Sequence, residues 1–140
     1  MNILLAVDGS AYTKKMLAYL AAHDDLLGTR HEYTAITVQA ALPPRARAAL
    51  GKDVVDKYYA DQAEKVLSPV TKFLERKGVV VKTISKVGPA GETIGKVADA
   101  GKYDLLLMGS HGHGALATLV MGSVTTQVLA NSKVPVLIVR

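Results

Sequence analysis

The amino-acid sequence predicts an α/β fold in which a five-stranded, doubly wound parallel sheet carries helices on both faces. Three observations support this prediction. Short apolar runs alternate with segments of helical periodicity along the chain. The runs at 105–108 and 134–139 are apolar at nearly every position, as expected for strands covered on both sides. Polar, glycine-rich sequences follow the first and fourth strands, which predicts that these two are neighbours, in a strand order of 3-2-1-4-5.

The composition is that of one globular domain over residues 1–140, with 49% apolar and 21% charged residues. The absence of cysteine excludes a disulfide scaffold, a thiolate zinc site, an iron–sulfur cluster and a cysteine nucleophile, and it fits the cytoplasm. No apolar run is long enough for a signal peptide or a membrane span. The second half of the chain holds nine basic and four acidic residues and accounts for the net charge of +5. Because aromatic residues do not interleave with these bases, nucleic acid is an unexpected partner.

The N-terminal part of the chain predicts a strand, a helix and a second strand. Residues 2–8 form a compact apolar run that ends in Asp-Gly-Ser, which is typical of a buried strand. Ser10 can cap the following helix, and Gly28 is expected to end it. Residues 31–39 are rich in β-branched and aromatic side chains and predict the second strand.

The middle of the chain predicts a long loop, a long helix and a third strand. Residues 40–52 contain two prolines and three basic residues, which indicates a loop. Apolar residues recur at helical spacing over 53–77, and Gly78 closes that helix. Residues 79–87 predict the third strand.

The last part of the chain predicts two further helix–strand pairs. Pro89 opens a short helix that ends at Gly101, and proline is well tolerated in a first turn. Residues 103–108 predict the fourth strand. A helix over 123–131 and a strand over 134–139 complete the fold.

Two strand ends carry polar residues at the sheet edge where ligands of open parallel sheets bind. The first strand ends in Val7, Asp8, Gly9 and Ser10, and the fourth runs into the glycine-rich residues 108–114. If the two strands are neighbours, Asp8 and the glycine-rich segment face each other across one crevice.

A second signal lies in Gly122-Ser123-Val124-Thr125, at the start of the last predicted helix. A helix N-terminus offers unpaired N–H groups and a partial positive charge, so it can bind a phosphate. Gly122 lets the backbone approach closely, and Ser123 and Thr125 can donate hydroxyl hydrogen bonds. The alternative is an ordinary serine N-cap preceded by a turn glycine.

The glycine spacing excludes three other motifs. Gly109 and Gly112 are followed, after nine intervening residues, by Gly122 and Ser123. No lysine follows the glycine at the helix start, which excludes a Walker motif. The glycines follow the fourth strand rather than the first, which excludes the dinucleotide fingerprint. Met108 stands two residues before Ser110, which excludes a Gly-x-Ser-x-Gly nucleophile elbow.

This Gly-x-x-Gly-x9-Gly-Ser spacing resembles that of the universal stress protein family, specifically of its ATP-binding branch. The resemblance covers the whole chain. The opening Ile-Leu-Leu-Ala-Val-Asp-Gly-Ser, the segment Val87-Gly88-Pro89 and the two closing apolar strands are similar to the corresponding family segments. It implies a Rossmann-like fold of the kind predicted above.

The resemblance also implies how an adenine nucleotide is held. Asp8 is expected to accept a hydrogen bond from the ribose or a group near the adenine, and Val38 to contact the adenine. The residues expected at the nucleotide are Ala6, Val7, Asp8, Val38, Met108, Gly109, Ser110, Gly112, His113, Gly122, Ser123, Val124 and Thr125. The implied cofactor is ATP, with ADP or AMP as alternatives, with or without Mg²⁺. Family members commonly dimerise through the last strand, here from Val134 to Val139.

The segment between Gly112 and Gly122 departs from the family pattern, because many members carry a lysine or arginine there and this chain has neither. Phosphate charge would be met by backbone N–H groups, hydroxyls, a metal ion or histidine. His111 and His113 allow three interpretations: plain loop residues, a metal-binding pair without an evident third ligand, or groups that bind phosphate when protonated. No catalytic residue and no metal site is predicted.

The sequence therefore predicts a stress-response regulatory protein that binds an adenine nucleotide, forms a homodimer and acts on an unidentified protein partner. One alternative is a slow ATPase or phosphate-transferring enzyme, for which Asp8, His111 and His113 are the candidate groups. Another is nucleic-acid binding through the basic second half, which would show a steep salt dependence.

Overall fold

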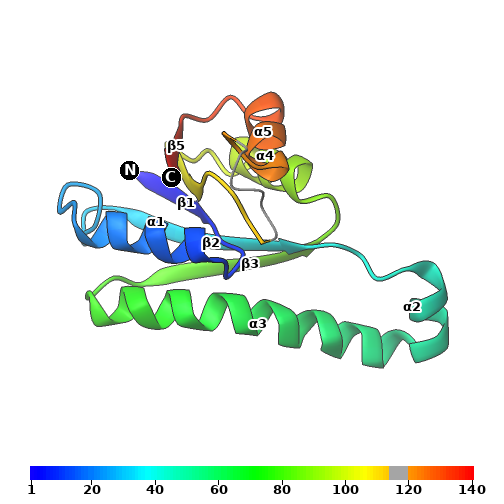
Figure 1. The fold of residues 1–140 in the computed structure, drawn as a ribbon. Helices are drawn as coiled ribbons and strands as arrows, with labels where there is room; N and C mark the ends of the chain where they lie inside the picture. Colours follow the sequence, from blue (N-terminus) through cyan, green and yellow to red (C-terminus); the bar gives the residue numbers. More distant parts are fainter. Residues whose placement is uncertain (114–119) are drawn as a thin grey trace.

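The computed structural model describes residues 1–113 and 120–140, and this part of the chain forms a five-stranded sheet (Figure 1). All strand pairs are parallel, and the order β3-β2-β1-β4-β5 confirms the predicted order. Residues 114–119, which stand between Gly112 and Gly122 in the sequence, lie outside the described residues.

The bounds of the elements follow the predicted alternation of strands and helices. The strands are β1 (Asn2–Ala6), β2 (Glu32–Gln39), β3 (Val81–Val87), β4 (Leu105–Gly109) and β5 (Val136–Val139). The helices are α1 (Ala11–Ala21), α2 (Pro44–Leu50), α3 (Lys52–Arg76), α4 (Ala90–Ala100) and α5 (Ser123–Asn131).

Helices α1 and α3 cover one face of the sheet, and α4 and α5 cover the other (Figure 1). Side chains of the central strand alternate between the two faces. Ile3 and Leu5 pack with α1 and α3, whereas Leu4 and Ala6 pack with α4 and α5. The strand is apolar throughout because both of its faces are buried.

Helix α1 is shorter than predicted. Ser10 caps it as expected, since its hydroxyl accepts a hydrogen bond from the N–H of Tyr12, but the helix ends at Ala21 and not near Gly28. The segment beyond it is tied to β2: the Tyr33 hydroxyl donates to the carbonyl of Leu26 and accepts from the N–H of Gly28. Burial raises the pKa of this hydroxyl above its ordinary value.

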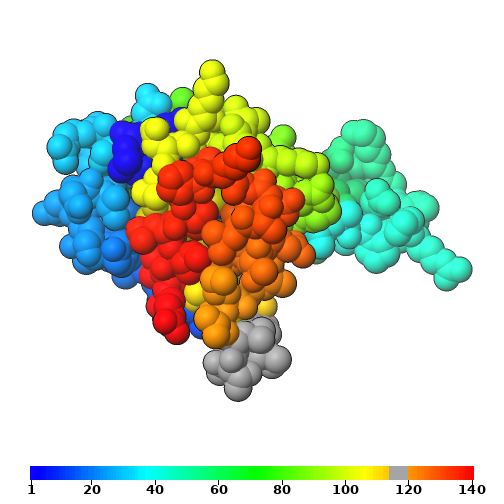
Figure 2. Space-filling model, turned by 90° about the horizontal axis from the view of Figure 1, so that it is seen from above, coloured from blue at the N-terminus to red at the C-terminus, as the bar shows by residue number. Residues whose placement is uncertain are grey.

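The prediction of a loop over residues 40–52 is wrong, because the segment contains helix α2. Pro44 stands in its first turn, where the missing N–H costs nothing, and alanine, arginine and leucine favour the helix that follows. Gly51 then joins α2 to α3 with a φ of 82°. Residues 42–59 project beyond the sheet (Figures 1 and 2) and are called the α2–α3 arm below.

Helix α3 has 25 residues, and at 1.5 Å per residue it extends about 38 Å. Its buried side chains from Ala63 to Leu74 pack on the sheet, which leaves its first turns in the arm. Among residues 1–113 and 120–140, no helix combines the length and the apolar character needed to cross a membrane.

Candidate functional site

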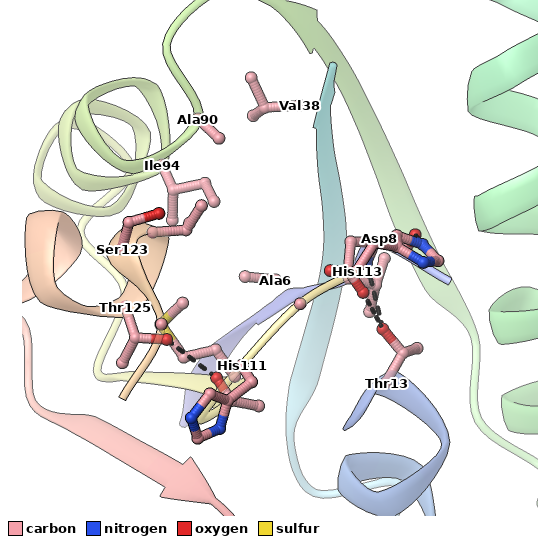
Figure 3. A pocket seen from close by; sticks show the side chains of 16 residues that line it. Ala6, Asp8, Thr13, Val38, Ala90, Ile94, His111, His113, Ser123 and Thr125 are labelled. Atoms are coloured by element: carbon pink, nitrogen blue, oxygen red, sulfur yellow. Dashed lines mark hydrogen bonds between the residues drawn. The ribbon is translucent and has the colours of Figure 1, made fainter. Parts of the chain in front are cut away.

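A cavity of about 420 Å³ lies beyond the carboxyl ends of β1 and β4, against the first turns of α4 and α5 (Figure 3). It sits where the strand order reverses, because β1 has β2 on one side and β4 on the other. Its described lining residues are Ala6, Val7, Asp8, Thr13, Val38, Ala90, Ile94, Met108, Gly109, His111, Gly112, His113, Gly122, Ser123, Val124 and Thr125.

This cavity brings together all the residues predicted to contact a nucleotide except Ser110. Ser110 is fully buried; its N–H donates to the carbonyl of Val139 at 2.8 Å, and its carbonyl accepts from the N–H of Gly122 at 2.7 Å. It therefore connects β4 to β5 and to the start of α5 instead of lining the cavity. Contact of the other residues with a nucleotide stays a prediction.

Sequence reasoning missed four lining residues: Thr13, Ala90, Ile94 and His111. Ala90 and Ile94 lie on the side of α4 that faces the sheet, and their apolar character predicted only that they belong to the hydrophobic core. Thr13 stands in the first turn of α1, and its position only five residues after Asp8 was the one feature of the sequence that could have placed it at the site. His111 was interpreted as a plain loop residue, as a metal ligand or as a group that binds phosphate when protonated, but it was not among the residues expected at the nucleotide.

The turn after β1 holds the Asp8 carboxylate in a fixed orientation. Its Oδ1 accepts hydrogen bonds from the N–H of Ser10 at 2.9 Å and from the hydroxyl of Thr13 at 3.0 Å. The same Thr13 oxygen accepts from the N–H groups of Asp8 and Gly9, at 3.1 and 3.2 Å. Gly9 has a φ of 77°, a value that glycine adopts readily. These contacts leave Oδ2 as the carboxylate oxygen without a bond to the turn.

The loop after β4 passes directly beside this carboxylate. A Cβ placed on Gly112 would lie 2.6 Å from Asp8 Oδ2, so glycine is required for the close approach. His113 strengthens the contact, because its Nε2–H donates to the carbonyl of Asp8 at 2.7 Å. The ends of β1 and β4 are thus joined across the rim of the cavity.

The N-terminus of α5 forms the opposite side of the cavity. Gly122 is its N-cap residue and no side chain caps the helix, so its first N–H groups are available to a ligand. The predicted donor role of the Thr125 hydroxyl is not supported, because that hydroxyl donates to the carbonyl of Gly109 at 3.0 Å. Ser123 is exposed and makes no side-chain hydrogen bond within the described residues.

The cavity has an apolar end and a polar middle. Figure 3 shows Val38, Ala90 and Ile94 together at one end, with Asp8 and Ser123 on opposite sides of the open space. Such a cavity suits a ligand with a flat apolar part, hydroxyl groups that donate to a carboxylate, and an anionic group near a helix N-terminus.

Comparison with known proteins agrees with this arrangement. A model of the universal stress protein family matches residues 1–140. The chain belongs to the universal stress protein family. The family predicted from the glycine spacing is therefore confirmed, whereas membership of its ATP-binding branch stays a prediction.

Two curated members of the family are similar to this chain in sequence. Universal stress protein Slr1230 of Synechocystis sp. is 36% identical over 139 residues, which are 99% of this chain and 42% of Slr1230. Universal stress protein MJ0577 of Methanocaldococcus jannaschii is 39% identical over 80 residues, which are 57% of this chain and 49% of MJ0577. In both cases the match covers less than half of the relative's length.

Solved structures of the family have the same fold as this universal stress protein. The structure of MJ0577 matches with a TM-score of 0.81 and 28% identity, over 99% of this chain and 94% of that chain. The universal stress protein of Archaeoglobus fulgidus in complex with dAMP matches with a TM-score of 0.70 and 19% identity, over 100% of this chain and 98% of that chain.

Proposed function

We propose that this universal stress protein is a regulatory protein that binds an adenine nucleotide in the cavity at the ends of β1 and β4. The observation that carries the proposal is that Asp8, Gly112 and the first turn of α5 come from separate segments and converge on that cavity. The dAMP held by the Archaeoglobus fulgidus protein, which has the same fold, supports this ligand class.

Each part of the nucleotide has a matching part of the cavity. The adenine ring packs between the apolar side chains of Val38 and Ile94, which gain from excluding water. The ribose hydroxyls donate to Oδ2 of Asp8, the carboxylate oxygen that the turn leaves open. The phosphate lies at the N–H groups of Ser123 and Val124, where the helix dipole favours negative charge.

The proposed ligand is ATP, ADP or AMP, and Mg²⁺ accompanies the forms with several phosphates. The protein works in the cytoplasm, in the stress response, through a protein partner. It forms a homodimer through β5, an edge strand whose residues Val136–Val139 are only half-buried in the single chain and can pair with a second copy.

The first test is to identify the natural ligand. The protein is purified quickly under native conditions and denatured, and the released nucleotide is identified by chromatography and mass. Stoichiometric release of an adenine nucleotide supports the proposal. A protein that releases none, and that binds none when titrated with ATP, ADP or AMP, contradicts it. Steady release of phosphate from ATP in the same samples would indicate the ATPase alternative.

The Gly122→Val variant tests the position of the site. A Cβ at Gly122 would lie 3.3 Å from the Cα of His111 and 3.4 Å from the carbonyl oxygen of Ser110. Valine therefore pushes the start of α5 away from the β4 loop, and we expect nucleotide affinity to fall about tenfold or more, or 1.4 kcal/mol.

The matched control for that experiment is Leu129→Val, a change on the same helix at a side chain that is 44% exposed and outside the cavity. It should bind nucleotide as the unmodified protein does, in the same calorimetric titration. Equal affinity of all three proteins would show that the nucleotide binds elsewhere.

A further inference from the structure

The cavity contains an acidic side chain but no lysine or arginine among its described lining residues. The segment between Gly112 and Gly122 adds no permanent cation either, because its sequence contains neither residue type. Asp8 brings a carboxylate to the polar side, and its Oδ1 is bonded only to neutral donors, namely the N–H of Ser10 and the hydroxyl of Thr13. The side chains around the phosphate position therefore carry little positive charge to offset a strongly anionic ligand.

The N-terminus of α5 is the main attraction for a phosphate in this cavity. Its N–H groups at Ser123 and Val124 have no backbone acceptor within the described part of the chain, and no side chain caps them. A helix N-terminus acts as roughly half a positive charge, and its effect is confined to the first turn. The geometry can therefore serve one phosphate group well, but among residues 1–113 and 120–140 the lining offers no lysine or arginine side chain for the next.

Two lysines near the cavity do not change this conclusion, because neither lines it. Lys15 has its Nζ 4.6 Å from the centre of the Tyr12 ring, on α1. Lys86 is paired in register with Val38, at the apolar end where the base is proposed to lie. Neither belongs to the segments that face the proposed phosphate position.

We propose that this site selects adenine nucleotides with a single phosphate over those with two or three, an inference that rests on the proposed function. A single phosphate ester carries about −1.5 to −2 charges at pH 7 and can be held by the first turn of α5. A further phosphate that stays in solvent gains no contact. One that enters the cavity loses hydration and meets the charge of Asp8 without a compensating cation.

The test is a calorimetric titration of the nucleotide-free chain with adenosine, AMP, ADP and ATP. It is done without divalent cations at about pH 8, where histidine side chains are ordinarily neutral. We expect AMP to bind more tightly than adenosine, with an affinity at least about threefold above that of ATP. An ATP affinity equal to or above that of AMP overturns the inference.

A variant that adds a cation should reverse the preference. His113→Lys places an ammonium group on the lining of the cavity, and we expect the ratio of ATP affinity to AMP affinity to rise about tenfold. Ser123→Lys is a second variant with the same expected direction, at an exposed lining position. The matched control is Val80→Lys, because Val80 is 86% exposed and precedes β3, at the opposite edge of the sheet.

The outcomes separate this inference from the proposed function. If no adenine nucleotide binds, the proposed function fails and the selectivity fails with it. If adenine nucleotides bind but ATP is preferred, the proposed function stands and the selectivity is wrong. If both lysine variants leave the ATP-to-AMP ratio at the value of Val80→Lys, charge does not set the preference and the inference is overturned.

Discussion

Two segments that bound the polar side of the cavity are built in different ways. The turn after β1 is fixed by side-chain hydrogen bonds, with the Thr13 hydroxyl linking the Asp8 carboxylate to two backbone N–H groups. The loop after β4 is fixed by close backbone approach, because the space that a Cβ would need beside Gly109 and Gly112 is occupied by Tyr12 and Asp8. The turn after β1 thus depends on the hydrogen bonds of its side chains, whereas the segment at the end of β4 depends on having no side chain at Gly109 and Gly112.

The difference predicts how each segment responds to substitution. Hydrogen bonds contribute about 1 kcal/mol each, so the β1 turn should weaken in small steps. A Cβ added at Gly109 or Gly112 would overlap Tyr12 or Asp8, so this segment should respond to a single added carbon atom with a larger loss. Three substitutions test this contrast, from the largest expected effect to the smallest.

The largest effect is expected for Gly109→Ala. The new methyl group would collide with the Cβ of Tyr12 and lie 3.3 Å from its backbone carbonyl, so α1 would have to move away from β4. We expect the free energy of unfolding to fall by about 2–3 kcal/mol in urea denaturation. The matched control is Gly28→Ala, where the added Cβ comes no closer than 3.9 Å to any other atom. Equal stability of both variants would refute the steric explanation.

A smaller effect, directed at binding, is expected for Gly112→Ala. Its Cβ would lie 2.6 Å from Asp8 Oδ2, so the carboxylate must rotate away from Ser10 and Thr13. We expect AMP affinity to fall about tenfold in calorimetry. The loss of stability that accompanies it should disappear in the double variant with Asp8→Ala, because the colliding carboxylate is then absent. Additive losses of stability would show that the conflict involves another group.

The smallest effect is expected for Thr13→Val, which removes one hydroxyl and keeps the shape of the side chain. The N–H groups of Asp8 and Gly9 lose their acceptor, and Asp8 Oδ1 keeps only the N–H of Ser10. The three hydrogen bonds that are lost are part-buried, so water can replace part of each, and we expect about 1–2 kcal/mol less stability and an AMP affinity lower by a factor of about three to five. Thr13→Ser retains the hydroxyl and should restore both values. If serine fails to do so, packing of the methyl group is the cause.

Local signals in the sequence were sufficient to predict the sheet and the crevice between the ends of its first and fourth strands. Individual lining residues such as Val38 and Met108 were expected only from the resemblance to the family. Apolar runs located the strands, and the positions of Asp8 and Gly112 after the first and fourth strands favoured an order in which those strands are neighbours. The roles of Thr13 and Ile94 were not predictable in this way. Thr13 lines the site because its hydroxyl bonds back to the Asp8 carboxylate, and Ile94 because the first turns of α4 lie against the cavity.

The errors in the helices have similar physical causes. The segment after the early end of α1 is held by Tyr33, a residue of β2 whose hydroxyl bonds the backbone of Leu26 and Gly28. Such a contact between distant parts of the sequence leaves no periodic signal. Helix α2 was missed because Pro43 and Pro44 favour both loops and helix starts, and only the residues after them distinguish the two.

The α2–α3 arm is connected to the rest of the protein mainly through one continuous helix. Val55 is buried within the arm, and the next buried residue of α3 is Ala63, about two turns further on. Hydrogen bonds from Gln39 and Leu42 to Tyr59 mark the place where the arm leaves the sheet. Opening of the arm would thus break few contacts of the core, so its amide protons should exchange with solvent well before those of β1 and β4. For protein engineering, the arm is a place where whole helical turns can be added or removed while the cavity keeps its geometry.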